Sequence, residues 1–277
     1  MRLALLTALV MVAFAANSVL NRAAVGPGHI DPGSFAAIRV VAGAVMLCAI
    51  LAVRRVPLPL LARARLPGVL GLSAYMTGFS LAYLTLDAGL GALILFGTVQ
   101  IGMFAWGAVT GAPPTRRALL GAGVAFAGLM LALWPGSGAA ADPVGAALMV
   151  IAGLGWAAYT LAGRGAPDAL AATAANFVWS VPLLALVLLG PQLSVSGLGA
   201  VLAILSGAVT SGLGYALWYA VLRKLNTSTA SVVQLSVPMI AIAGGALVLA
   251  ETPDIAVLFA AVLVVGGIAL AVTGARR

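Results

Sequence analysis

Charged side chains are scarce in this sequence. Only 7% of its 277 residues are Asp, Glu, Lys or Arg, and 63% are hydrophobic, whereas a soluble domain carries about 25% charged residues. Such a chain cannot cover itself with a polar surface, so an ordinary soluble protein is excluded. The composition indicates a polytopic membrane protein, whose backbone must be paired internally in helices or in a closed barrel.

Cysteine and histidine are almost absent. Cys48 is the single cysteine and lies in an apolar run, while His29 is the single histidine and lies in a loop. One cysteine excludes a disulfide within the chain and a thiolate metal site. The sequence also lacks a zinc-binding His-Glu spacing, a Gly-x-Ser-x-Gly turn and a phosphate-binding glycine loop. We therefore expect no enzymatic activity, no metal and no cofactor.

Acidic residues are missing from the middle of the apolar runs. All six Asp and Glu residues fall in predicted loops or at predicted helix ends. Proton-driven pumps commonly use an intramembrane carboxylate or histidine as a relay. Its absence favours a facilitator or an exchanger, or else coupling through a helix-end acid such as Asp87 or Glu251.

The apolar runs themselves are about 20 residues long and show no strand alternation. This length lets a helix cross a hydrocarbon core of roughly 30 Å, so we predict an all-α fold. The first run contains Ala13-Phe14-Ala15, which imitates a signal-peptide cleavage site, but the run continues to Val25 and we expect it to be retained. The ten predicted transmembrane helices are Leu3–Val25, Gly33–Val53, Leu66–Leu86, Gly89–Thr110, Arg117–Trp134, Pro143–Gly163, Ala169–Leu189, Leu198–Leu222, Thr227–Leu249 and Asp254–Thr273.

Basic and acidic residues separate when these ten spans are threaded through a membrane. The basic side holds Arg2, Arg54, Arg55, Arg63, Arg65, Arg116, Arg117, Arg164, Arg223, Lys224, Arg276 and Arg277. The opposite side holds Asp31, Asp87, Asp142, Glu251 and Asp254, with Arg22 as its only base. By the positive-inside rule both termini are cytoplasmic. The net charge of +8 is then a topology signal, and we expect no nucleic-acid partner.

An internal repeat organises the chain. Pro253 and Gly267 each follow their counterparts, Pro114 and Gly128, by 139 positions. Five helices per repeat place the second set upside down relative to the first, which is the inverted-repeat architecture of many secondary transporters. The predicted units are a first five-helix repeat over 1–135, a short extracytoplasmic linker over 136–142 and a second five-helix repeat over 143–277.

Uncharged polar residues recur near the middle of the spans. Asn17 and Asn21 are four residues apart, as are Asn176 and Ser180, so each pair shares a helix face. Two interpretations remain open, because such residues either stabilise helix packing or line a polar cavity. The candidate substrate-binding residues of this kind are Asn17, Asn21, Gln100, Asn176 and Gln234.

Aromatic residues are also found at depth. Tyr75, Phe79 and Tyr83 form an i, i+4, i+8 stripe on the third predicted helix, and Trp156 and Tyr159 fall near the middle of the sixth. A stripe of this kind is packing, or it lines a cavity suited to flat or apolar side chains. We treat all five as candidate substrate contacts.

Arg39 and Pro238 are candidate gating or hinge elements. Arg39 lies well inside the second span, where an unpaired arginine costs about 2.5–3.5 kcal/mol. Either it reaches back to the interface, or it faces the bundle interior and holds a carbonyl or a substrate carboxylate. Pro238 removes a backbone hydrogen bond in what we predict to be mid-helix, where freed carbonyls are tolerated if they are re-paired or line a cavity.

The ten-helix inverted repeat and the segment running from Pro238 to Glu251-Thr-Pro253 resemble the EamA-type branch of the drug/metabolite transporter superfamily. Arg39 and Arg22 also match that family's pattern, whereas Ala112 stands where the family often has a glutamate. Within the branch the chain is most similar to the bacterial aromatic amino-acid exporters of the YddG type. The resemblance implies export of amino acids and related metabolites through a central cavity.

We therefore expect a bacterial inner-membrane exporter that works by alternating access. The expected cargo is a neutral amino acid, especially an aromatic or large apolar one. The expected partners are therefore this small molecule and membrane lipid, and a monomer is allowed. Efflux of lipophilic drugs or toxic metabolites is the alternative within transport. A membrane scaffold that transports nothing is the alternative outside it.

Overall fold

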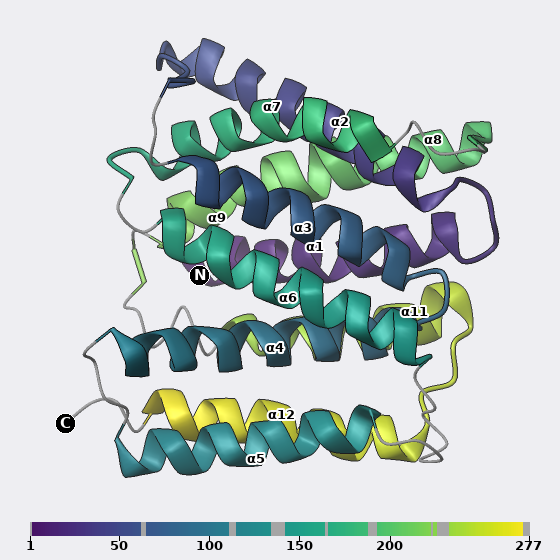
Figure 1. Ribbon diagram of the computed structural model, residues 1–277, viewed down its shortest axis with the longest axis vertical. Helices are drawn as coiled ribbons and strands as arrows, with labels where there is room; N and C mark the ends of the chain where they lie inside the picture. The colour runs from purple at the N-terminus through teal and green to yellow at the C-terminus, as the bar shows by residue number, and fades with distance from the viewer. Residues whose placement is uncertain are drawn as a thin grey trace.

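Figure 1 shows the computed structural model, which describes residues 2–61, 65–110, 115–133, 142–163, 166–187, 193–222, 224–225 and 233–273. Within these ranges the chain is helical, and its only strand-like pairing is an isolated bridge between Ile30 and Val195. The all-α prediction is confirmed for this part of the chain. The helices are α1 (Arg2–Val25), α2 (Pro32–Arg54), α3 (Leu66–Ala82), α4 (Ala88–Val109), α5 (Arg116–Leu133), α6 (Pro143–Gly163), α7 (Ala169–Val187), α8 (Gly197–Ile204), the π-helix η2 (Leu205–Leu213), α9 (Gly214–Leu222), α11 (Ser236–Leu249) and α12 (Ile255–Thr273).

Seven helical spans in the described residues are long and apolar enough to cross a membrane. One of them is the continuous span Gly197–Leu222, which comprises α8, η2 and α9. Three further apolar helices are shorter, namely Leu66–Ala82, Ser236–Leu249 and Ile255–Ala271. Large apolar side chains such as Leu247 and Val109 are exposed on the outside of the bundle, as expected when the surrounding solvent is lipid.

The helices lie side by side, with α5 and α12 at one edge of the bundle and α2 and α7 at the other (Figure 1). Between these edges α3 packs on α6, α1 packs on α11 and η2, and α4 packs on both α6 and α11. Helices from the two halves of the sequence therefore alternate in space, and one core continues through the bundle.

Glycines allow α5 and α12 to approach closely. A Cβ atom at Gly128 would lie 2.7 Å from Leu263 Cβ and 2.9 Å from the backbone N of Val264. A Cβ atom at Gly267 would meet the backbone of Gly121 and Ala125. Such contact distances leave no room for a side chain, so the pair depends on small residues as membrane helices often do.

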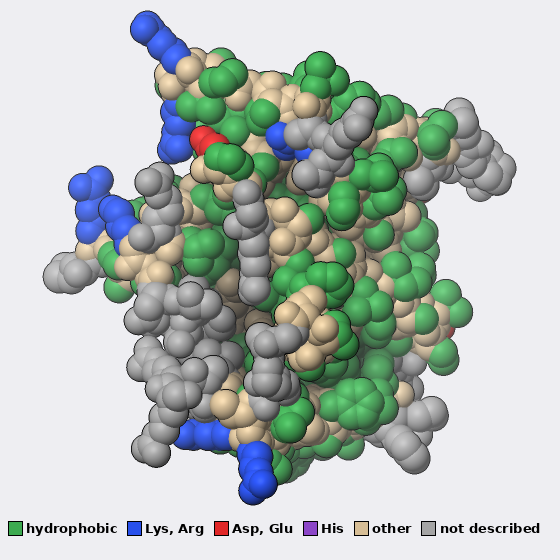
Figure 2. Space-filling view, turned by 60° about the vertical axis from the view of Figure 1, so that its left-hand side comes forward, with side chains coloured by type: hydrophobic (Ala, Val, Ile, Leu, Met, Phe, Trp, Pro, Cys, Tyr) green, Lys and Arg blue, Asp and Glu red, His purple; other side chains and the backbone are tan. Residues whose placement is uncertain are grey.

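Charge is divided between the two ends of the helices. The basic end carries Arg54, Arg55, Arg65, Arg116, Arg117 and Lys224, and Figure 2 shows Lys and Arg side chains projecting from it. The acidic end carries Asp31, Asp87, Asp142, Glu251 and Asp254. Asp168 is an acid at the basic end, where its carboxylate accepts hydrogen bonds from the backbone N–H groups of Leu170 and Ala171 at the start of α7.

Two helix limits differ from the sequence-based prediction by four residues or more. The third helix was predicted to reach Leu86 but ends at Ala82, because residues 83–86 form the turn that reverses the chain before α4. The helix predicted over Thr227–Leu249 is interrupted at Leu235, and α11 begins only at Ser236. Residues 226–232, Ala112 with its neighbours 111–114, and most of the predicted linker, 136–141, lie outside the described residues.

The interruption corrects the prediction for Pro238. It lies in the first turn of α11 and not in mid-helix. The physical reason is that a proline ring cannot donate to the carbonyl four residues earlier, here that of Gln234, and clashes with it. The helix therefore stops before Leu235 and restarts where Pro238 is tolerated, with the Ser236 hydroxyl donating to the Val233 carbonyl at 2.6 Å.

Candidate functional site

Arg39 lies at the centre of the candidate site. Its side chain is completely buried, so it faces the bundle interior and does not reach back to the interface. Nη2 donates to the Tyr75 hydroxyl at 2.9 Å, and Nε donates to Ser211 Oγ at 3.2 Å. The guanidinium carbon also lies 5.2 Å from the centre of the Tyr75 ring and 5.0 Å from that of Phe79, within the range of a cation–π interaction.

The positive charge of Arg39 has no carboxylate partner. Every Asp and Glu of the chain is among the described residues, and the salt bridges that they form with described bases all involve Arg22. In addition, Nη1 of Arg39 is buried without any hydrogen-bond partner. Buried charges are normally paired, so this guanidinium retains an unused capacity to bind an anion.

A polar network connects Arg39 to α1. Asn17 Oδ1 accepts hydrogen bonds from Ser206 Oγ at 2.9 Å, Thr210 Oγ1 at 2.6 Å and Ser211 Oγ at 3.4 Å. These three donors belong to η2, whose wider turns bring positions i, i+4 and i+5 to one face. Ser211 touches both Asn17 and Arg39, which explains how a π-helix contributes to this site.

Asn21 lies one turn beyond Asn17 on α1. It is completely buried, and its Nδ2 donates to Ser80 Oγ at 3.1 Å. Its Oδ1 is buried without a hydrogen-bond partner. The site thus contains an unused acceptor as well as an unused donor.

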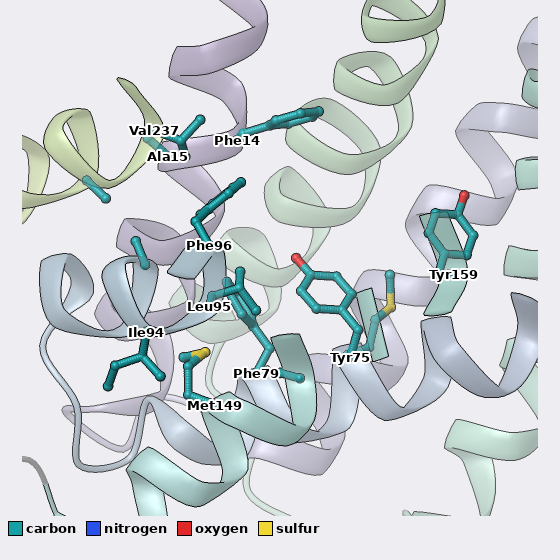
Figure 3. Packing of buried hydrophobic residues seen from close by; sticks show 14 of the residues in the cluster. Phe14, Ala15, Tyr75, Phe79, Ile94, Leu95, Phe96, Met149, Tyr159 and Val237 are labelled. Carbon is teal, nitrogen blue, oxygen red and sulfur yellow. The ribbon is translucent and has the colours of Figure 1, made fainter. Parts of the chain in front are cut away.

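Aromatic rings surround the guanidinium. The predicted stripe is a continuous stack, because the ring centres of Tyr75 and Phe79 are 5.2 Å apart and those of Phe79 and Tyr83 are 4.8 Å apart. Trp156 joins it at 4.9 Å from Tyr75 and 5.2 Å from Tyr159. Figure 3 shows the Tyr75 hydroxyl pointing away from Tyr159. Trp156 keeps part of its surface exposed although it contacts these rings, so it lies at the edge of the packed group.

Other predicted site residues have partners elsewhere. The Tyr159 hydroxyl shares a hydrogen bond of 2.7 Å with Thr173, which also donates to the Tyr219 hydroxyl. Asn176 packs against Gly68 of α3, and its Oδ1 is buried without a partner. Gln100 is buried within α4, and Gln234 is partly exposed in the helical residues before α11.

Sequence reasoning missed the importance of Tyr215. Its ring centre lies 5.3 Å from that of Trp156, 5.8 Å from that of Phe14 and 5.9 Å from that of Phe177. Tyr215 therefore connects rings from α1, α6 and α7. The spacing of Tyr215, Trp218 and Tyr219 at i, i+3 and i+4 was the available signal, since these positions lie together on a helix.

Ionic contacts lie at the acidic end. Arg22 Nε is 3.2 Å from Glu251 Oε1, and Arg22 Nη2 is 3.4 Å from Asp87 Oδ1. Arg22 Nη1 donates to the backbone carbonyls of Tyr83 and Leu84. This acidic-end cluster joins the end of α1, the turn after α3, the start of α4 and the segment after α11.

The Glu251 carboxyl in this cluster has a raised pKa. Burial raises the pKa of its carboxyl above the usual 4.5, and the nearby negative charge of Asp87 raises it further. The Ala88 backbone N–H, which donates to Oε2 at 2.9 Å, and Arg22 act in the opposite direction. The net result is a carboxyl that takes up a proton more readily than an ordinary glutamate.

Among the described residues no three His, Cys, Asp or Glu side chains form a group that could hold a metal ion.

Comparison with known proteins identifies the family. Residues 143–273 match the model of the EamA-like transporter family. A Pseudomonas aeruginosa protein, named uncharacterized protein PA1977, is 46% identical over 272 residues, covering 97% of this chain and 94% of its own length. The chain belongs to the EamA-like transporter family. Membership makes this EamA-like transporter a multi-pass membrane protein that moves small molecules, since members of the family are transporters and not enzymes.

A solved crystal structure has the same fold as this EamA-like transporter. It covers 100% of the chain and 99% of its own chain with a TM-score of 0.68, at 19% sequence identity. At this identity the likeness concerns the fold alone. The function must therefore be argued from the site.

Proposed function

We propose that this EamA-like transporter exports neutral amino acids, preferentially those with aromatic or large apolar side chains, by alternating access. The observation that carries the proposal is the position of Arg39 among Tyr75, Phe79 and Ser211 in the bundle interior. A cation, hydroxyl groups and aromatic rings in one buried place complement the charged backbone and the flat side chain of an aromatic amino acid.

Each group of residues has a role in this hypothesis. Tyr75, Phe79, Tyr83 and Trp156 contact the substrate side chain, with Tyr159 supporting Trp156. Arg39 and five amide side chains orient the amino and carboxylate groups, and these amides are those of Asn17, Asn21, Gln100, Asn176 and Gln234. Pro238 acts as a hinge in this hypothesis, next to the break at Leu235 between the helical residues Val233 and Gln234 and α11.

Alternating access requires two halves that move against each other, and we propose ten transmembrane helices in two inverted five-helix repeats over 1–135 and 143–277. Helix contacts support this. In the proposed repeat α6 corresponds to α1, α4 to α11, and α3 to the span that contains η2 and α9. The contact of α3 with α6 then has its counterpart in the contact of α1 with η2 and α9, and the contact of α4 with α6 in that of α1 with α11. The glycine contacts agree with this repeat. Gly128 lies against Val264, and Gly267 lies against Ala125. Gly267 follows Gly128 by 139 positions, and Val264 follows Ala125 by the same 139 positions.

The proposed location is the bacterial inner membrane with both termini in the cytoplasm. The basic end then faces the cytoplasm, as the positive-inside rule requires. In this orientation the acidic-end cluster faces outward, where Arg22 joins the end of α1 to Asp87 and Glu251. The likeness to exporters of the YddG type belongs to the same hypothesis.

Competition tests the cargo. Proteoliposomes loaded with labelled phenylalanine should release it through the purified protein, and an excess of unlabelled neutral amino acid loaded on the same side should compete with the label and slow this release. Release that a lipophilic cation inhibits and amino acids do not inhibit would instead indicate drug efflux. No transport of any solute, together with co-purification of a fixed partner, would indicate a scaffold.

A further inference from the structure

We infer that Nη1 of Arg39 binds the carboxylate of the transported molecule and that Oδ1 of Asn21 accepts a hydrogen bond from its ammonium group. This assignment rests on the proposed function and names the chemical class of its cargo, a zwitterionic α-amino acid. Both atoms are buried and unpartnered, and both residues are completely buried. Arg39 Nη1 is thus a hydrogen-bond donor without an acceptor, and Asn21 Oδ1 is an acceptor without a donor.

The donor is suited to a carboxylate. Arg39 uses Nε for Ser211 and Nη2 for Tyr75, and the two aromatic rings of Tyr75 and Phe79 lie against the guanidinium. An incoming anion therefore meets the Nη1 edge. A guanidinium presents its N–H donors in a fixed plane that matches a carboxylate, and no Asp or Glu of the chain, all of which are described, competes for it within salt-bridge distance.

The acceptor is connected to the donor through α1 and η2. Ser211 links Arg39 to Asn17 by hydrogen bonds of 3.2 Å and 3.4 Å. Asn21 follows Asn17 by one helical turn on the same face, and Asn21 holds Ser80, the residue next to Phe79. A molecule that carries a carboxylate and an ammonium group can satisfy both unused atoms, whereas an amine or an ester leaves Arg39 without its anion.

A series of ligands tests this on the unmodified protein. The thermal midpoint of the purified transporter in detergent should rise with phenylalanine and, less strongly, with 3-phenylpropionate. Phenethylamine and phenylalanine methyl ester, which lack the carboxylate charge, should bind about tenfold more weakly or worse, because the Arg39 contact is charge-assisted. Equal binding of phenylalanine and its methyl ester would overturn the assignment.

Variants locate the effect. Arg39→Gln should lose the preference for phenylalanine over its ester, whereas Arg54→Gln, which removes an exposed charge at the basic end, should keep it. Should Arg39→Gln fail to fold, the ligand series on the wild type still decides. If carboxylate binding depends on Arg39 but phenylalanine is not transported, the site assignment is supported and the export proposal is wrong. If phenylalanine is transported but Arg39→Gln keeps the preference for phenylalanine over its ester, this assignment is wrong and the export proposal is unaffected.

Discussion

Arg22 and Glu251 are separated by 229 positions in the sequence, yet Nε of one lies 3.2 Å from Oε1 of the other. The contact joins the last turn of α1 to the residues that follow α11. With Asp87 and the backbone carbonyls of Tyr83 and Leu84, it ties both halves of the chain together at the acidic end. In an alternating-access cycle this contact must break for the acidic end to open.

A double-mutant cycle on Arg22 and Glu251 measures this contact. Arg22→Gln and Glu251→Gln should each lower the free energy of unfolding, and the double variant should lose less than the sum, with a coupling of about 0.5–2 kcal/mol because the pair is partly buried. The matched control is the Arg22 and Asp87 pair, in which Asp87 is more exposed, so its coupling should be about 0–1 kcal/mol. Additive effects at Glu251 would show that the ion pair stabilises nothing.

The raised pKa of Glu251 predicts a pH dependence. The folded state binds this proton more tightly than the unfolded chain, so the linked stability is complete below the usual glutamate value of 4.5 and is lost as the pH rises through the raised pKa. The thermal midpoint of the wild type should therefore fall with rising pH in this window relative to that of Glu251→Gln, which cannot titrate. Parallel profiles of the two proteins over about pH 4 to 8 would contradict the prediction.

Substitution of two neighbouring glycines of α12 should have different effects on the stability of the protein. Gly267→Ala places a Cβ against the backbone of α5, which should destabilise the protein by about 1–3 kcal/mol through overpacking. Gly266→Ala is the control, because a Cβ there meets nothing within 4 Å, and it should leave stability unchanged or slightly higher. Denaturation in mixed detergent measures both, and equal effects would show that the α5–α12 contact is looser than described.

Trp156 should matter for transport more than for folding. Trp156→Ala removes its contacts with Tyr75, Tyr159 and Tyr215, and we expect transport to fall roughly three- to tenfold, in proportion to about 1 kcal/mol of aromatic contact. Trp106→Ala, at an exposed position on α4, is the control and should leave transport unchanged. If transport and the yield of folded protein fall together in Trp156→Ala, the residue serves packing only.

The sequence predicted the helical fold well because apolar runs and charge at their ends are local signals. The limits of Pro143–Gly163 were predicted correctly, and those of α1, α2 and α4 to within one residue. The depth of Arg39 was visible, but its burial was not, because only the tertiary structure shows that Tyr75 and Ser211 receive its donors. The π-helix at Leu205–Leu213 was invisible, since the shift from i+4 to i+5 pairing has no fixed sequence signature.

Contacts between residues far apart in the sequence were the second feature that the sequence could not predict. Nothing in a single sequence joins Arg22 to Glu251 or Asn17 to Ser206, because their contacts depend on how distant helices pack. Pro238 was correctly singled out as a helix breaker but placed in mid-helix, because a proline can end one helix and begin another with equal ease. Tyr215 was overlooked because its ring contacts with Phe14, Trp156 and Phe177 come from three other helices, and these contacts depend on how the helices pack.

Counterflow of labelled amino acids into liposomes containing the purified protein tests the central claim most directly. We predict accumulation of labelled phenylalanine in liposomes loaded with unlabelled phenylalanine, at the same rate with and without an imposed pH gradient, because every Asp and Glu of the chain is described and lies at a helix end or in a turn. Accumulation only with the gradient would mean that an acid such as Asp87 or Glu251 couples transport to protons. No accumulation of any neutral amino acid would contradict the account.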